Sequence, residues 1–126
     1  MITEKICNFE ISNLLKTKFF NIPGWFFYSQ NAPDGLASWN GTEQDWNSYE
    51  ALVSAPTYQT VFDWFRQWYG IDIDVLSYHT QNNRQYRWVG YVDGRFFSED
   101  DKHTVYYDKH EDAENAAIKY VLTEII

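Results

Sequence analysis

An amphipathic segment in the middle of the chain constrains the fold more than any other feature. Pro56 precedes this segment and Gly70 follows it, which suits the first turn of a helix and the left-handed position after its end. We predict a central helix in which Phe65 is buried and only one of Trp64 and Trp68 is fully buried. The apolar side chains that recur at the spacing of one helical face are Tyr58, Val61, Phe62, Phe65, Trp68 and Tyr69.

Helices are also predicted near both ends of the chain. Residues 10–19 carry apolar side chains at helical spacing, and Asn8 or Ser12 is the expected N-terminal cap. The last helix should begin after Asp108, its expected cap, because acidic residues crowd the first turn, where the helix dipole favours negative charge. Its apolar side is formed by Ala113, Ala116, Ala117, Tyr120, Val121 and Ile125.

Two groups of strands are predicted between the helices. The aromatic run at 25–29 favours a strand, and the turn residues at 31–35 suggest that 36–39 returns beside it. The mostly polar stretch 40–54 is predicted to be a long loop. Alternation at 71–75 and the hairpin signal Asp93-Gly94 predict a meander of 71–75, 86–92 and 95–97, with 104–107 as a further strand.

These elements predict one α+β domain over residues 1–126, with about three helices packed on a small, mostly antiparallel sheet. The chain of 126 residues is long enough for one core. Cys7 is the only cysteine, which excludes an intrachain disulfide and fits a reducing compartment. No signal sequence and no run of about 18 apolar residues is present, so we expect a cytoplasmic protein without membrane association.

Charge narrows the class of partner. The chain has 18 acidic and 10 basic side chains and a formal net charge of −8. Such a chain repels duplex DNA and attracts basic surfaces, so direct binding to duplex DNA is disfavoured and a basic protein is the expected partner. Aromatic residues make up 20% of the sequence, more than a core needs, and exposed rings are well suited to recognition.

Two stretches resemble a group of small, mostly uncharacterised proteins encoded by phages and prophages of Bacteroidetes. In that group a PT-x6-W helix precedes an I-x-I strand, a short meander and a YD-x-x-E-x-A entry to a C-terminal helix. The resemblance implies a phage origin and the cytosol of a bacterial host, and it supplies no catalytic residue. The matching positions are Pro56, Thr57, Trp64, Ile71, Ile73, Tyr107, Asp108, Glu111 and Ala113.

The candidate partner-binding residues are aromatic and acidic. Three tryptophans lie in the region that departs most from the resembled group, namely Trp25, Trp39 and Trp46. A negative patch is expected where a charged loop approaches the start of the last helix, because carboxylates on one face can occupy a basic groove meant for nucleic acid. Its members are Glu99, Asp100, Asp101, Glu111, Asp112 and Glu114.

Two other functions are open at this point. A sheet presenting rings beside arginines can stack single-stranded bases, and the candidates are Arg84, Tyr86, Arg87 and Trp88. A small metal-dependent hydrolase would need converging carboxylates; His103 beside Glu99, Asp100 and Asp101, or the pair Asp72 and Asp74, are the nearest approach. Both patterns are typical of solvated surfaces, so no metal, cofactor or catalytic residue is predicted.

The preferred hypothesis is therefore a phage-derived, non-enzymatic interaction protein. Its most specific version is an anti-CRISPR-like inhibitor of a bacterial defence nuclease, acting through an acidic and aromatic surface on a basic, nucleic-acid-binding effector. The single-stranded nucleic-acid-binding module and the small hydrolase are the alternatives.

Overall fold

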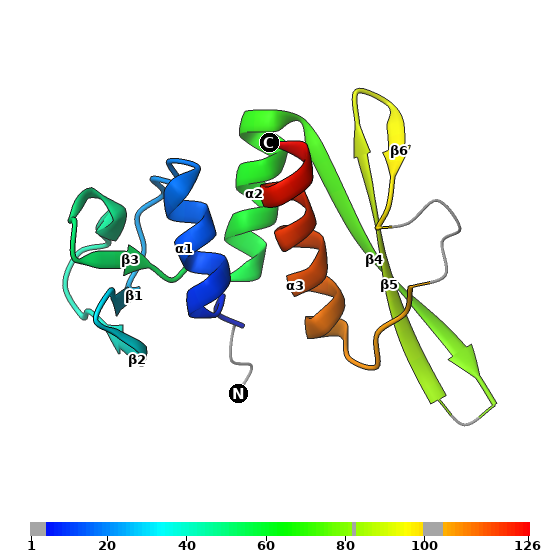
Figure 1. Ribbon diagram of the computed structural model, residues 1–126, viewed down its shortest axis with the longest axis horizontal. Coiled ribbons are helices and arrows are strands. Elements are labelled where there is room, and N and C mark those ends of the chain that lie inside the picture. Colours follow the sequence, from blue (N-terminus) through cyan, green and yellow to red (C-terminus); the bar gives the residue numbers. More distant parts are fainter. Residues whose placement is uncertain (1–4, 82, 100–104) are drawn as a thin grey trace. The chain divides into compact units, whose positions relative to one another are not determined.

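The computed structural model describes residues 5–81, 83–99 and 105–126 and divides the chain into two compact units (Figure 1). The first unit runs to Tyr58 and includes Ile126, and the second comprises Gln59–Ile125. Each unit has its own antiparallel sheet of three strands, in the orders β2-β1-β3 and β4-β5-β6. The α+β class is confirmed, with two small sheets in place of one, while the single domain over 1–126 stays a prediction.

In the first unit, α1 (Phe9–Thr17) forms where the helical spacing predicted it. Asn8 is the N-terminal cap, since its Oδ1 accepts a 2.9 Å hydrogen bond from the backbone N–H of Ile11. Ile11 and Leu15 are buried. The helix ends before Phe19, a non-glycine residue in the left-handed region with φ 63°.

The first sheet is built on β1 (Phe26–Ser29), which pairs with β2 (Ala32–Ser38) on one side and β3 (Leu52–Ser54) on the other. The prediction of a long loop over 40–54 is wrong in two places, because this stretch holds β3 and a short 3-10 helix, η1 (Trp46–Ser48). The backbone of this stretch is held by side-chain hydrogen bonds, which leave no periodic pattern in the sequence. Asn47 Nδ2 donates to Phe20 O at 2.8 Å, and its Oδ1 accepts from Ser54 N at 2.8 Å.

In the second unit, α2 (Tyr58–Tyr69) confirms the central helix, and its predicted face is buried at Tyr58, Val61 and Phe65. The predicted face is wrong at the C-terminal end of the helix, because Trp68 and Tyr69 are exposed and Trp64 is buried instead. Phe65 and Trp64 are buried, whereas Trp68 is 62% exposed, so only one of the two tryptophans lies in the core. Gly70 adopts φ 64° and turns the chain directly into β4, as its position after the helix predicted.

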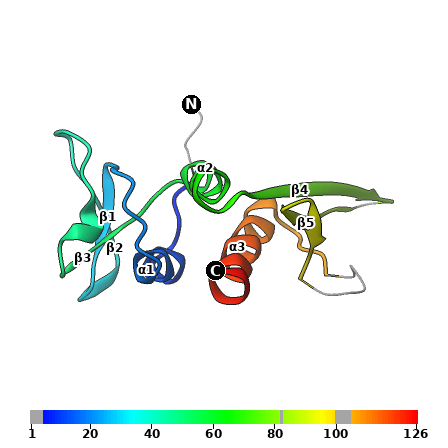
Figure 2. The same cartoon turned by 90° about the horizontal axis from the view of Figure 1, so that it is seen from above.

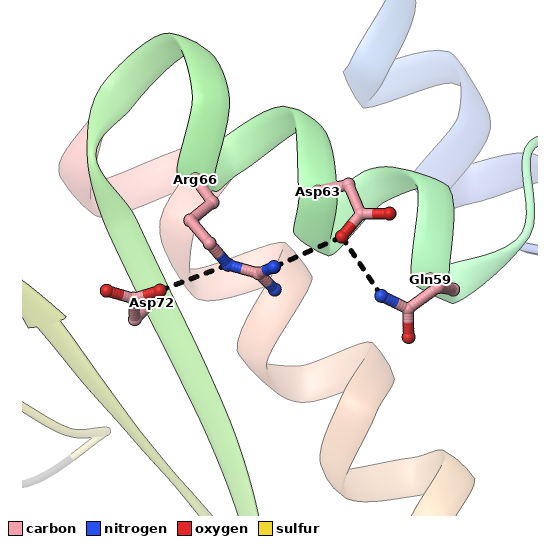
Figure 3. Close-up of polar contacts among 4 residues, drawn as sticks. All are labelled: Gln59, Asp63, Arg66 and Asp72. Atoms are coloured by element: carbon pink, nitrogen blue, oxygen red, sulfur yellow. Dashed lines mark hydrogen bonds and ion pairs between the residues drawn. The ribbon is translucent and has the colours of Figure 1, made fainter.

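An exposed polar chain spans the corner between α2 and β4 (Figure 3). Arg66 Nε lies 3.1 Å from Asp72 Oδ1, and Arg66 Nη1 lies 3.2 Å from Asp63 Oδ1. Asp63 Oδ1 also accepts a 3.0 Å hydrogen bond from Gln59 Nε2. Because these side chains are about half exposed, the pairs contribute little to stability.

The second sheet is a meander of β4 (Ile71–Thr80), β5 (Asn83–Val92) and β6 (Arg95–Phe97). The first two strands are longer than predicted and form a hairpin whose far end extends beyond α3 in Figure 1. Asp93 and Gly94 adopt φ 51° and 74°, which confirms the two-residue hairpin turn. Asp72 and Asp74 are exposed, and Ile71 on the opposite face is buried.

The last helix, α3 (His110–Tyr120), continues into a π-helical turn, η2 (Val121–Ile125), and lies along one face of the second sheet (Figure 2). Its N-cap is Lys109, with no side-chain hydrogen bond, so the prediction that Asp108 caps the helix is wrong. Of the predicted strand 104–107, Thr104 lies outside the described residues and Tyr107 forms an isolated bridge with Tyr86. No helix in the described part of the chain has the length and apolar character needed to cross a membrane.

Replacing Phe65 with alanine should lower the free energy of unfolding by about 3–5 kcal/mol, because it empties a fully buried ring site. Trp68→Ala is the matched control on the same helix and should change stability by less than about 0.5 kcal/mol, since that ring is exposed. Urea unfolding followed by circular dichroism measures both. Equal losses for the two variants would contradict the assigned buried face.

Candidate partner-binding sites

Four rings in the first unit form an aromatic cluster, which we define as Phe27, Trp39, Trp46 and Tyr49. Trp46 is at its centre: its ring centroid lies 4.4 Å from that of Phe27, 6.2 Å from that of Trp39 and 6.2 Å from that of Tyr49. Trp46 is only 6% exposed, and its Nε1–H donates to Gly24 O at 2.9 Å. Trp46 is therefore a supporting core residue, which corrects its place among the predicted partner-binding rings.

The outer members of this region remain open to solvent. Trp39 is 45% exposed and Tyr49 is 49% exposed. Trp25 is 48% exposed and lies beside Trp39, since Trp25 O accepts a 2.8 Å hydrogen bond from the backbone N–H of Trp39. Of the three tryptophans predicted from the sequence, Trp25 and Trp39 thus share one strand end and present rings to solvent.

Two of the exposed rings, those of Trp39 and Tyr49, are held in place by contacts. The Trp39 ring packs directly on Gly41, where an added Cβ would come within 2.3 Å of Trp39 Nε1. Tyr49 OH donates to Gln44 Oε1 at 3.1 Å. Lys16 Nζ donates to three backbone carbonyls next to this ring, those of Tyr49, Glu50 and Leu52, at 2.9, 3.1 and 2.6 Å. Rings that are already fixed lose little entropy when a partner covers them.

The sequence around the aromatic cluster is acidic. Between residues 40 and 58 it contains Glu43, Asp45 and Glu50 and no lysine or arginine. Glu43 and Glu50 are exposed, whereas Asp45 caps η1 by accepting from Asn47 N at 3.1 Å. A basic partner would therefore meet both apolar area and negative charge at this surface.

The structure separates the predicted acidic patch into residues with different roles. Asp100 and Asp101 lie outside the described residues. Glu99 is half-buried and does not present its carboxylate as part of a solvated loop, because Trp88 and Tyr107 both donate to it. The remaining members lie at the start of α3: Glu111 is half-buried, Asp112 is exposed, and Glu114 Oε1 is 2.9 Å from His110 Nδ1.

The negative charges of Glu99 and Asp112 both act on Tyr107. Burial raises the pKa of the Tyr107 hydroxyl above its ordinary value, and the hydrogen bond to Glu99 and the charges of Glu99 and Asp112 raise it further. The hydroxyl donates to Glu99 Oε1 at 2.6 Å and Oε2 at 2.7 Å. The neutral tyrosine is thus the form that this site stabilises. Tyr107 was missed as a site residue because the YD motif suggested only packing and capping.

The candidate nucleic-acid residues do not form one surface. Trp88 is 2% exposed, so the prediction that it stacks a base is corrected. Arg84 Nη2 lies 2.8 Å from His79 Nε2, and Tyr86 packs edge-on against His110. Arg87 is on the opposite face of β5, because successive strand residues alternate. On that second face the rings of Tyr78, Tyr91 and Phe96 are each partly exposed, whereas Val89 is buried.

No cluster of three histidine, cysteine, aspartate or glutamate side chains suited to a metal ion is found among residues 5–81, 83–99 and 105–126. His103, with which the metal hypothesis began, lies outside these ranges. Cys7 is fully buried, and its backbone carbonyl accepts from Tyr28 OH at 2.9 Å. The thiol therefore lacks the exposure that a nucleophile needs.

Gly41→Ala should displace the Trp39 ring without unfolding the first unit, because the new methyl group would overlap the indole. In a ¹⁵N-correlation spectrum the Trp39 indole signal should shift strongly while that of Trp88 stays in place. Gly24→Ala is the matched control, since a Cβ at Gly24 meets nothing within 4 Å. An unmoved Trp39 signal in the Gly41 variant would contradict the packing described.

The raised pKa of Tyr107 makes stability depend on pH in the alkaline range. The folded state holds this proton more tightly than the unfolded chain, so the free energy of unfolding should fall as pH rises above the unfolded tyrosine pKa of about 10. Tyr107→Phe should weaken that fall. Parallel urea titrations at pH 8 to 11 measure the difference, and identical slopes for wild type and variant would refute it.

No protein-family model matches this chain, and no match is found among curated proteins or among solved structures.

Proposed function

We propose that the protein is a non-enzymatic interaction module of the bacterial cytosol that binds a basic protein through Trp25, Trp39 and Tyr49. The observation that carries the proposal is the exposure of these three large rings beside the buried Trp46. Rigid aromatic anchors at the centre of a contact surface supply most of the binding energy in typical interfaces.

The charge of the chain supports a basic partner. The net charge is −8, and Glu43 and Glu50 are exposed close to the rings in sequence. The second unit adds negative charge through Asp112 at the start of α3 and through Asp100 and Asp101, which belong to the acidic patch predicted from the sequence. Complementary charge raises the rate of encounter and disfavours acidic competitors such as nucleic acid.

The motifs shared with phage and prophage proteins favour one class of basic partner. A phage protein benefits from blocking a defence nuclease, and such an enzyme must carry a basic groove for its own nucleic acid. We therefore propose an anti-CRISPR-like inhibitor as the specific version of this function, with the rings as anchors and the carboxylates as competitors for the groove.

The single-stranded nucleic-acid module remains the second candidate, on a different surface from the one predicted. The face of the second sheet that bears Arg87 also carries the partly exposed rings of Tyr78, Tyr91 and Phe96, and exposed rings beside an arginine can stack bases. The net charge of the chain opposes this candidate, because nucleic-acid affinity depends on neutralising phosphates.

The test measures binding kinetics on a panel of purified bacterial defence nucleases, across a salt series. We expect the double variant Trp25→Ala/Trp39→Ala to dissociate about tenfold faster or more, as hot-spot rings do. The double variant Glu43→Gln/Glu50→Gln should instead associate more slowly and show a weaker salt dependence, because exposed charges mainly steer encounter.

Trp68→Ala is the matched control, since it removes an exposed tryptophan from the second unit. An equal effect of Trp68→Ala would mean that the aromatic cluster has no special part in binding. Saturable binding of a single-stranded oligonucleotide that Arg87→Ala abolishes, with no protein bound, would replace the proposal by the second candidate.

A further inference from the structure

A pocket of about 270 Å³ in the second unit is lined by two residues that lie between β6 and α3 in the chain and by residues of α3 and η2. Its walls combine two aromatic rings with two carboxylates and one ammonium group. The lining residues are Glu99, Tyr107, Ala116, Lys119, Tyr120, Thr123 and Glu124. Small-molecule sites usually exceed about 300 Å³, so this pocket is suited to a single side chain.

The Glu99 carboxylate is the most firmly oriented polar group of the pocket. Its Oε1 accepts from Trp88 Nε1 at 2.9 Å and from Tyr107 OH at 2.6 Å. Trp88 is buried in the core, so the indole cannot follow a carboxylate that swings away. The Tyr107 hydroxyl is also 2.7 Å from Oε2, so its proton is shared between the two carboxylate oxygens. A carboxylate has about four acceptor positions, so acceptor capacity remains on Oε2 and on the Tyr107 oxygen.

Both donors to Glu99 are neutral. Within the described ranges, no lysine, arginine or histidine forms an ion pair with its carboxylate. The half-buried carboxylate accepts hydrogen bonds from neutral groups and can accept a further one from a ligand. A cationic donor would form the stronger, charge-assisted bond there.

The aromatic wall suits a flat cation. Tyr120 is stacked on Phe97, with centroids 6.2 Å apart and planes 16° apart, and its centroid lies 5.3 Å from that of Trp88. Tyr107 is held by its bonds to Glu99. These contacts hold the two rings that line the pocket. Guanidinium groups stack on aromatic rings and present several N–H donors in one plane, whereas an ammonium group is a compact point charge.

We propose that this pocket binds the guanidinium group of an arginine side chain presented by a protein partner. The lining contains two carboxylates, those of Glu99 and Glu124, and one ammonium group, that of Lys119. The lining therefore carries a net negative charge, which favours a cationic ligand. The site goes beyond the function proposed above, because the aromatic cluster belongs to the other unit and takes no part in it.

The test uses N-acetyl-L-arginine amide as the probe and the Trp88 indole N–H signal as the readout. Trp88 donates directly to Glu99, so ligand binding at the carboxylate should shift this signal in a saturable way, with a dissociation constant in the millimolar range. The citrulline analogue has the same shape without the charge and should produce no saturable shift. Glu99→Gln should weaken arginine binding tenfold or more.

Two further variants keep the result interpretable. Asp34→Asn removes one exposed carboxylate from the first unit and should leave the dissociation constant unchanged. Ala116→Leu fills the pocket while keeping every bond to Glu99, and it should abolish binding even if Glu99→Gln fails to fold. Folding of each variant is checked by the dispersion of the other indole signals.

Three outcomes would overturn the inference. The first is a shift of the Trp88 signal by the arginine probe that Glu99→Gln and Ala116→Leu both leave intact. The second is binding of the citrulline analogue as tight as that of the arginine probe. The third is equally tight binding of the corresponding lysine amide. None of these outcomes bears on Trp25 or Trp39, so failure here is separate from failure of the aromatic cluster as a binding surface.

Discussion

A buried indole N–H must find an acceptor, and both units are organised around one such bond. In the first unit Trp46 donates to Gly24 O, and in the second Trp88 donates to Glu99 Oε1. Leaving either donor unpaired in the core would cost about 1–3 kcal/mol, a sizeable part of the stability of a small protein. Each bond also fixes the surface next to it. The first holds the support beneath the exposed rings, and the second fixes the carboxylate of the pocket.

Local patterns in the sequence were sufficient wherever the structure is decided by neighbouring residues. The central helix, the left-handed Gly70, the cap at Asn8 and the Asp93-Gly94 turn all follow from a few adjacent side chains. The same reasoning failed for the stretch 40–54, for Trp46 and for Glu99. Their positions depend on bonds to residues far along the chain: Asn47 binds Phe20 and Ser54, and Glu99 binds Trp88 and Tyr107. No periodicity records such bonds, so the candidate site was only half predictable.

In the proposed interactions the first unit contributes exposed rings and the second unit contributes a pocket. Exposed rings supply apolar contact area, and the affinity they give depends little on the charge of the partner. The Glu99 pocket instead selects one functional group, the guanidinium group of arginine. The acidic surplus of the chain acts at longer range than either and speeds the approach of a basic protein. A partner that satisfies all three conditions is more narrowly defined than one that satisfies any of them.

Lys16 connects α1 to the segment that carries Tyr49. Its ammonium group binds three carbonyls of the segment that carries Tyr49, while its backbone belongs to α1. The ring surface is therefore tethered to a helix rather than carried on an independent loop. Any motion that opens this segment must either break three charge-assisted bonds together or move the helix with it. A lysine engaged in this way is also a poor substrate for acylating enzymes, because its three protons are already occupied.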